Sequence, residues 1–316
     1  MRLYRFIADW ILIIAIVGGI LSYFVAASVP ASAQTRATVL SVVQTLQPLL
    51  IFAMLFLTFC KVDLRHLRLC RYHWWLLLFQ AGLYLALGAV VMSLPRDGLR
   101  IVLEGAMICF ICPTATAGAV IVKKLGGSPA HITTYTILIN LTASLMIPVT
   151  IPLVHPNPDM SLGNAMVLIL GKVFPLLLLP LVGAWLLRQL LPKVHATVQK
   201  YGHLSFELWV VALGLATAVT TRYIMHSTTS LSTDLWLVAV SLIACVMQFW
   251  VGRKIGGHYG ETITGGQSLG QKNTVLAIWL GYTFFTPVTS VVGGFYSIWH
   301  NIINSRQLYR HKHGLG

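Results

Sequence analysis

The sequence predicts an all-α integral membrane protein with ten transmembrane helices, of which the fourth and the ninth are broken. Of its 316 residues, 57% are hydrophobic and only 9% are charged, whereas soluble domains average about 25% charged residues. Apolar segments long enough to cross a bilayer recur along the whole chain. Two of them are interrupted by proline, glycine and polar residues, at 112–118 and 270–274. The expected spans are 6–28, 38–60, 74–94, 99–124, 129–153, 162–191, 205–225, 234–252, 263–284 and 286–305.

The basic residues between these spans predict the orientation of the chain. When residues near the span ends are counted with the adjoining loops, sixteen of the 22 lysines and arginines fall at the termini and in every second loop, four fall on the opposite side, and two lie deep inside spans. Because cytoplasmic loops are rich in lysine and arginine, both termini are expected in the cytoplasm, in a plasma membrane of the bacterial inner type. This orientation also explains the net charge of +14, so the expected surroundings are a lipid bilayer and no nucleic acid.

The N-terminal segment has two interpretations. Arg2 and Arg5, an apolar run and the sequence Ala31-Ser32-Ala33 resemble a secretory signal with its cleavage site. However, the apolar stretch from Trp10 to Ala27 is longer than the core of a usual signal. We therefore favour a retained first helix, with cleavage of residues 1–33 as the alternative.

Ten spans divide into two sets of five, which predicts an inverted repeat. An odd number of spans per half makes the second half enter the membrane in the opposite direction, so 1–156 and 157–316 are the expected five-helix repeats. The two interruptions then occupy equivalent positions, in the fourth span of each repeat. Broken helices at matching positions indicate a binding site where they cross. The alternative is that they only reflect the high glycine and proline content of membrane helices.

Several polar residues inside the spans are candidates for this site. Thr136, Asn140 and Ser144 follow one another at intervals of four and so share one helical face. Gln80 and Asn301 are similar polar residues in the third and tenth spans. Such residues either hold helices together or line a cavity, and the sequence leaves both interpretations open.

Lys272 is the most informative charged residue, because it stands at the second interruption. An ammonium group near the bilayer centre needs a carboxylate, a set of carbonyl groups, or the loss of its proton. Lys172, inside the sixth span, is interpreted as structural or as reaching the membrane surface. Glu104 lies near the outer end of the fourth span, and a pair between Glu104 and Lys172 is one alternative that the sequence leaves open.

Both interruptions and the last span carry a family resemblance. The segment 112–117, Cys-Pro-Thr-Ala-Thr-Ala, resembles the Cys-Pro-Gly-Gly-Thr-Ala element of the bile acid:sodium symporter family. The segment 270–274, Gly-Gln-Lys-Asn-Thr, followed by Leu276 and Ala277, resembles that family's Gly-Met-Gln-Asn-Ser and Leu-Ala. The run 295–301, Phe-Tyr-Ser-Ile-Trp-His-Asn, is similar to its last-helix pattern. The resemblance implies ten spans in two inverted repeats, with spans 4 and 9 unwound where they cross, and transport of bile acids, pantoate or other small carboxylates driven by two sodium ions.

The chain departs from that family at the residues expected to hold sodium. Ser268 stands where the family has an acidic ligand, and Lys272 replaces its glutamine ligand. Gly118 and Ala119 replace the Ser-Asn pair that follows Thr-Ala in the fourth span. Sodium is a hard cation that needs several oxygen ligands. We therefore expect a sodium-independent member, and no metal or cofactor.

The function predicted from these observations is secondary transport of a small organic anion by alternating access, with Lys272 as the candidate group for proton coupling. The alternatives are an exchanger or uniporter with Lys272 as a fixed charge, and a non-transporting membrane sensor of the same fold. An enzyme is not expected, because no paired carboxylates, metal-ligand cluster or activated nucleophile is apparent. The expected substrate-binding residues are Thr114, Thr116, Asn273, Thr274 and Asn301. The expected ion or coupling residues are Lys272, Ser268, Gln80, Asn140 and Ser144.

Overall fold

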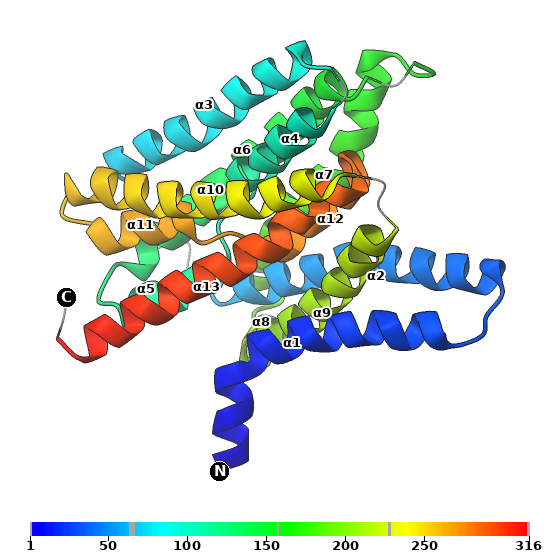
Figure 1. Cartoon of the computed structure of the whole chain (residues 1–316). Coiled ribbons are helices and arrows are strands. Elements are labelled where there is room, and N and C mark those ends of the chain that lie inside the picture. The colour runs from blue at the N-terminus through cyan, green and yellow to red at the C-terminus, as the bar shows by residue number, and fades with distance from the viewer. Residues whose placement is uncertain (1, 63–66, 96, 157, 227–228, 315–316) are drawn as a thin grey trace. The chain divides into compact units, whose positions relative to one another are not determined.

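The computed structural model describes residues 2–62, 67–95, 97–156, 158–226 and 229–314, with side chains from residue 13 onward. All regular elements among these residues are helices (Figure 1). Two compact units emerge: unit 1 comprises Met1–Lys61 and Pro180–Thr228, and unit 2 comprises Val62–Leu179 and Thr229–Gly316. Unit 1 holds α1 (Arg2–Ser28), α2 (Ala33–Cys60), α8 (Pro192–Lys200) and α9 (Leu204–Met225). Unit 2 holds α3 (Arg71–Ser93), α4 (Gly98–Ile111), α5 (Gly118–Lys124), α6 (Pro129–Val154), α10 (Leu231–Gly257), α11 (Thr262–Gly270), α12 (Thr274–Phe284), η2 (Pro287–Ser290) and α13 (Val291–Lys312), and α7 (Leu162–Leu190) belongs to both units.

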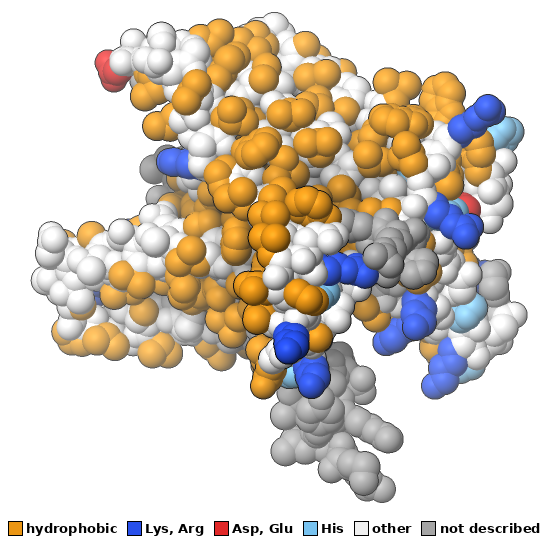
Figure 2. Space-filling model, turned by 180° about the vertical axis from the view of Figure 1, so that it is seen from behind, with side chains coloured by type: hydrophobic (Ala, Val, Ile, Leu, Met, Phe, Trp, Pro, Cys, Tyr) orange, Lys and Arg blue, Asp and Glu red, His pale blue; other side chains and the backbone are white. Residues whose placement is uncertain are grey.

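The helices have the lengths and surfaces of an all-α multi-pass membrane protein. Six helices among the described residues, α2, α3, α6, α7, α9 and α10, are long and apolar enough to cross a membrane. Large apolar side chains point outward from them, for example Leu78, which is 62% exposed, and Val167, which is 68% exposed. Hydrophobic side chains cover most of the face in Figure 2. Lipid is the solvent that suits such a surface.

A helix, or a pair of helices, occupies each of the ten predicted apolar segments. Both predicted interruptions are breaks, between α4 and α5 and between α11 and α12. Two helix boundaries differ from the prediction, because an apolar pattern does not detect polar helical segments. The expected loop after residue 191 contains α8, which begins with Pro192 in its first turn. The last helix, α13, continues past residue 305 through a polar segment to Lys312.

Unit 1 is held together by close helix contacts and buried amides. A Cβ atom added to Gly19 on α1 would lie 2.4 Å from the carbonyl oxygen of Gly214 on α9, so the two helices approach closely at these glycines. The buried amide of Gln47 on α2 donates to the carbonyl of Ala212, at 3.0 Å. Ser32, within the segment that resembles a cleavage site, is the N-cap of α2, and its hydroxyl accepts from the N–H of Thr35.

In unit 2, α10 and α11 form a tightly packed antiparallel pair (Figure 1). A Cβ atom on Gly252 would lie 2.3 Å from the carbonyl oxygen of Gly265, and one on Gly256 would lie 2.3 Å from the carbonyl oxygen of Glu261. Glycines four residues apart on one helix let two backbones come this close in a membrane protein. A buried cluster that includes Tyr72, Tyr135 and Leu269 joins α11 to α3 and α6.

A buried ion pair holds the end of unit 2 where α3 ends and α4 begins. Arg100 Nε lies 3.0 Å from Glu104 Oε1, and His155 Nε2 lies 3.0 Å from the same oxygen. Arg100 also donates to the carbonyls of Leu94 and Val154, so one guanidinium joins the ends of α3 and α6 to α4. Glu104 is therefore paired with Arg100 and His155, whereas Lys172 is exposed on α7. The alternative pairing of Glu104 with Lys172 is wrong, because Glu104 is paired with Arg100, one turn away on its own helix, and with His155.

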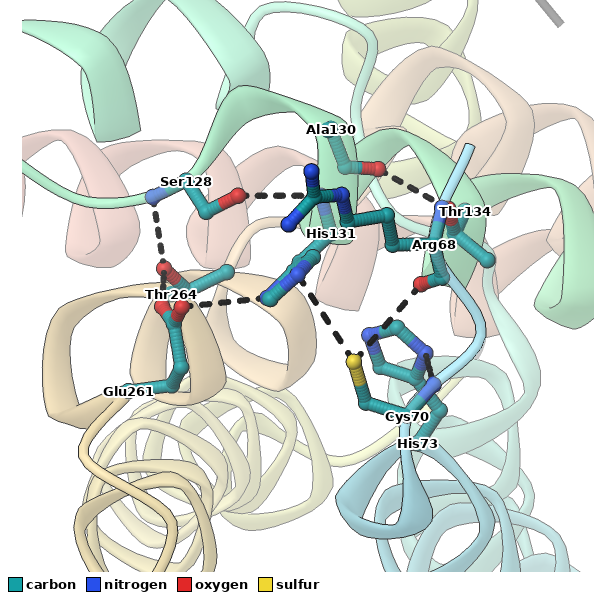
Figure 3. Close-up of polar contacts among 9 residues, drawn as sticks. All are labelled: Arg68, Cys70, His73, Ser128, Ala130, His131, Thr134, Glu261 and Thr264. Carbon is teal, nitrogen blue, oxygen red and sulfur yellow. Dashed lines mark hydrogen bonds and ion pairs between the residues drawn. The ribbon is translucent and has the colours of Figure 1, made fainter. Parts of the chain in front are cut away.

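The opposite end of unit 2, where α3, α6 and α11 begin, carries a second polar cluster. The imidazole of His131 lies between the Glu261 carboxylate, at 3.0 Å, and the Cys70 thiol, at 3.6 Å (Figure 3). Glu261 also accepts the hydroxyl of Thr264, and that hydroxyl oxygen accepts from the N–H of Ser128, at 2.9 Å. These bonds tie the segment after α5 to the first turn of α11. The end of α5 and the start of α11 therefore lie at the same end of unit 2.

Candidate functional site: the crossover of two broken helices

The first break follows directly from its proline. Pro113 has no N–H and disfavours a helical residue before it, and Cys112 has extended ψ, 128°. The helix α4 therefore ends at Ile111, and α5 begins only at Gly118. Gly118 also fills a packing need, because an added Cβ atom would lie 2.9 Å from Ile132 Cδ1 on α6.

The second break contains no proline and arises from a helix cap. Gln271 is extended, with ψ of 119°, and the side chain of Asn273 accepts from the N–H of Leu276. An asparagine in this role starts a new helix, α12, rather than continuing α11. Gly270 lies against the ring of Phe249 on α10, where an added Cβ atom would be 2.4 Å from Cγ.

The two breaks pair with each other through backbone atoms. The N–H of Asn273 donates to the carbonyl of Pro113 at 2.9 Å, and the N–H of Ala115 donates to the carbonyl of Gln271 at 3.2 Å. These two bonds flank an isolated antiparallel bridge in which Thr114 and Lys272 lie opposite each other without bonding to each other through their backbones. In a pair of this kind the Cα atoms come within about 4.5 Å. We call residues 112–117 together with 271–273 the crossover.

Side-chain donors cap the carbonyl groups that the two breaks leave without helical partners. Gln80 on α3 donates to the carbonyl of Cys112 at 3.2 Å, and Tyr296 on α13 donates to that of Gly270 at 3.0 Å. Gln248 on α10 donates both to the carbonyl of Cys109 and to the hydroxyl of Tyr296. Thr114 donates to the carbonyl of Ser268 at 2.7 Å. These oxygens are thus used within the protein.

The ammonium group of Lys272 is in the opposite situation. The residue is 1% exposed, and its Nζ has no hydrogen-bond partner among the described residues. The hydroxyl of Ser268, one turn earlier, is fully buried and likewise has no partner in that part of the chain. Among the described residues, the thiols of Cys109, Cys112 and Cys245 lie near Lys272. When the Lys272 amine is protonated, neutral thiols compensate its charge poorly, which favours the approach of an anion.

The helix dipoles add to this positive field. The first turn of α12, which has 11 residues, begins directly after Lys272 and Asn273. A helix N-terminus carries a partial positive charge and N–H groups without helical acceptors. Ammonium group and helix start therefore lie at adjacent positions of the chain, an arrangement that suits a carboxylate.

The crossover brings together most of the predicted site residues. Thr114, Lys272 and Asn273 form the pairing itself, Thr274 opens α12 and is 2% exposed, and Ser268 accepts the hydroxyl of Thr114. Gln80 also reaches the crossover, because it caps Cys112. Thr116 lies half-buried in the turn before α5.

Three predicted residues bond only locally in the hydrogen bonds of the described chain. Asn140 donates to the carbonyl of Thr136 at 2.7 Å, and its Oδ1 is buried without a partner there. Ser144 donates to Leu141, and Asn301 donates to Ser297. All three bonds lie within the residue's own helix.

Gln248, Tyr296 and Gln267 were not predicted from the sequence as individual site residues. Gln248 and Tyr296 cap the crossover, and Gln267 donates to Asn304 at 3.0 Å and to Gln307 at 2.9 Å. A signal existed for Gln248, which is a single amide in the apolar run of α10. A polar residue in the middle of such a span usually has a specific partner.

Removing the hydroxyl of Tyr135 is expected to destabilise unit 2. Tyr135 donates to Gln80 Oε1 at 2.8 Å, and both residues are fully buried. Tyr135→Phe leaves that oxygen without a donor, which costs about 1–3 kcal/mol. Thermal unfolding of the purified protein in detergent measures the loss, with Tyr309→Phe, at a residue 60% exposed, as the control. Gln80→Leu is expected to cost more, since it also leaves the Cys112 carbonyl uncapped; a milder effect of Gln80→Leu would contradict the capping role.

A scan against protein-family models and a search of curated proteins find no match to this chain.

Proposed function

We propose that this protein is a secondary transporter that carries a small organic anion by alternating access through the crossover. The observation that carries the proposal is Lys272, an ammonium group that is 1% exposed and has no hydrogen-bond partner among the described residues. A buried cation without a counter-ion costs several kcal/mol. A substrate carboxylate would offset this cost while it is bound, and Asn273, Thr274, Thr114 and Thr116 would supply hydrogen bonds to it.

The proposed architecture is ten spans in two inverted repeats, 1–156 and 157–316, with both termini cytoplasmic in the inner membrane. The breaks at 112–117 and 271–273 occupy equivalent places in this scheme. The antiparallel direction of their pairing is what an inverted repeat requires, because its broken spans run in opposite directions.

The capped carbonyl groups support a transport cycle without sodium. A sodium site needs several oxygen ligands, but the carbonyls of Cys109, Cys112, Ser268 and Gly270 already accept protein donors. Ser268 and Lys272 offer no carboxylate at the positions where the family that the sequence resembles has an acid and an amide. Lys272 is then either the group that takes up and releases the coupling proton or a fixed positive charge in an exchanger or uniporter.

Reconstitution into proteoliposomes tests the proposed function. A thermal-shift screen of small carboxylates, such as acetate, pyruvate, succinate and citrate, first identifies an anion that stabilises the protein. Counterflow of that radiolabelled anion into preloaded vesicles is expected for the wild-type protein and not for protein-free vesicles. Binding without counterflow or net uptake would instead indicate the sensor.

We expect anion binding and uptake to be the same in sodium, potassium and choline chloride at equal ionic strength. The reason is that four carbonyl oxygens near the crossover already accept protein donors and that Ser268 supplies no carboxylate. Initial uptake rates in the three salts, with the membrane potential clamped, provide the measurement. Reproducible stimulation by sodium alone would show that other oxygens form a sodium site, and would contradict this part of the proposal.

A further inference from the structure

A cavity of about 510 Å³ lies at the ends of α10 and α13, away from the crossover residues. Its basic lining consists of Arg253, Arg306, Arg310 and His311. The first comes from the last turns of α10, and the others from the last turns of α13. None of the described residues that line it carries a carboxylate. The cavity therefore has a concentrated positive charge that suits an anionic group.

The arginines are arranged on a fixed framework. Arg306 and Arg310 are four residues apart on α13 and so share one helical face. The aliphatic part of Arg253 lies against α11, where a Cβ atom added to Gly266 would be 2.5 Å from Arg253 Cγ. Arginine binds phosphate oxygens with two parallel hydrogen bonds, which a lysine cannot do.

The remaining wall of the cavity is apolar and extends along α10, away from the C-terminal end of that helix. It contains Val246, Phe249, Trp250 and Ile303. Val246 is 50% exposed and Trp250 is 56% exposed, on a helix long and apolar enough to cross a membrane. A soluble anion needs no such wall, whereas a phospholipid places its phosphate beside basic side chains and its acyl chains beside apolar ones.

We propose that this cavity binds one anionic phospholipid, with the phosphate between Arg253, Arg306 and Arg310 and the acyl chains along α10. The recognised chemistry is a phosphate group, and its source is a lipid. One hydrogen bond links the lining of the cavity to α11, the helix that ends at the crossover. Gln307 lines the cavity and accepts from Gln267 on α11, at 2.9 Å, five residues before Lys272. The inference requires a membrane protein but does not depend on what the protein transports.

The test compares lipids on the purified full-length protein by thermal shift. Phosphatidylglycerol in mixed micelles is expected to raise the melting temperature of the wild-type protein more than phosphatidylcholine does. Each basic side chain near an anionic headgroup contributes enough that Arg306→Gln with Arg310→Gln should weaken the apparent affinity about thirtyfold. Lys312→Gln is the matched control, because it removes a charge from the same helix at a residue that does not line the cavity. Arg306→Gln alone, with an expected loss of about fivefold, is available if the double variant is poorly folded.

A second measurement places the acyl chains. Phosphatidylglycerol with brominated chains quenches nearby tryptophan, so the quenching that disappears in Trp250→Phe reports on the cavity. That component is expected to shrink in the double arginine variant and to persist in Lys312→Gln. Equal stabilisation by phosphatidylcholine, an unchanged response of the double variant, or full stabilisation by inorganic phosphate alone would each overturn the proposal.

Discussion

Replacing Lys272 by glutamine is expected to abolish accumulation of the anion against its gradient while leaving anion exchange intact. Glutamine removes the group that can exchange a proton and keeps a polar side chain of similar length. If one proton moves with each anion, a pH difference of about one unit supports about tenfold accumulation. The variant should fall to simple equilibration. Uptake driven by an imposed pH gradient, measured beside counterflow on the same vesicles, separates the two activities.

The matched control is Lys172→Gln, which makes the same change at an exposed residue of α7 and should leave both activities unchanged. We also expect Lys272→Gln to raise the melting temperature, because a buried cation without a hydrogen-bond partner destabilises the folded state. Accumulation by the variant with unchanged pH dependence would show that Lys272 is not the coupling group. If the wild-type protein shows no pH dependence of uptake, and the folded variant still exchanges anions, the fixed-charge exchanger is established instead.

Gly252→Val is expected to cause a large loss of stability in unit 2. The new Cβ atom would lie 2.3 Å from the carbonyl oxygen of Gly265 and 3.0 Å from the Cα atom of Gly266. Both are backbone atoms, so α10 and α11 must separate. Overpacking a well-packed interior costs about 1–3 kcal/mol and occasionally more; we expect the upper end of this range. The apparent melting temperature in detergent, together with the recovery of monodisperse protein, is the measurement.

The control for this substitution is Gly82→Val on α3. Among the described residues, no atom beyond the adjoining part of α3 itself lies within 4 Å of a Cβ built on Gly82, so the same increase in side-chain volume meets open space. The difference between the two variants isolates the close approach of α10 and α11 from the general cost of valine in a helix. Equal stability of the two variants would mean that this close approach does not hold in the folded protein.

The helices of this protein were largely predictable, because life in a lipid bilayer imposes a strong apolar pattern on the sequence. A bilayer requires long apolar segments with internally satisfied backbones, and each predicted segment contains a helix or a pair of helices. The breaks were predictable from Pro113 and from the polar run around Lys272. The short helix α8 and the end of α13 were not, because their stability depends on local polar sequence rather than on an apolar pattern.

The candidate site was predictable in its location and less so in its contacts. A lysine in an apolar segment is easily found in the sequence, but the sequence does not show whether its Nζ has hydrogen-bond partners. The pairing of Thr114 with Lys272 depends on the three-dimensional path of two segments more than 150 residues apart in the sequence. The caps supplied by Gln248 and Tyr296 depend on helix rotation, which a nearly uniform apolar sequence does not specify.

Because the two breaks are joined by main-chain atoms, the backbone pairing of the crossover does not depend on which side chains it carries. The bonds from Asn273 to Pro113 and from Ala115 to Gln271 use only main-chain groups. Every residue provides a C=O, and every residue except proline provides an N–H. The side chain at position 272 can therefore change between an amide and an amine without loss of this backbone pairing. Under the proposed function, the energy source of such a transporter would change by a single substitution while the crossover is kept.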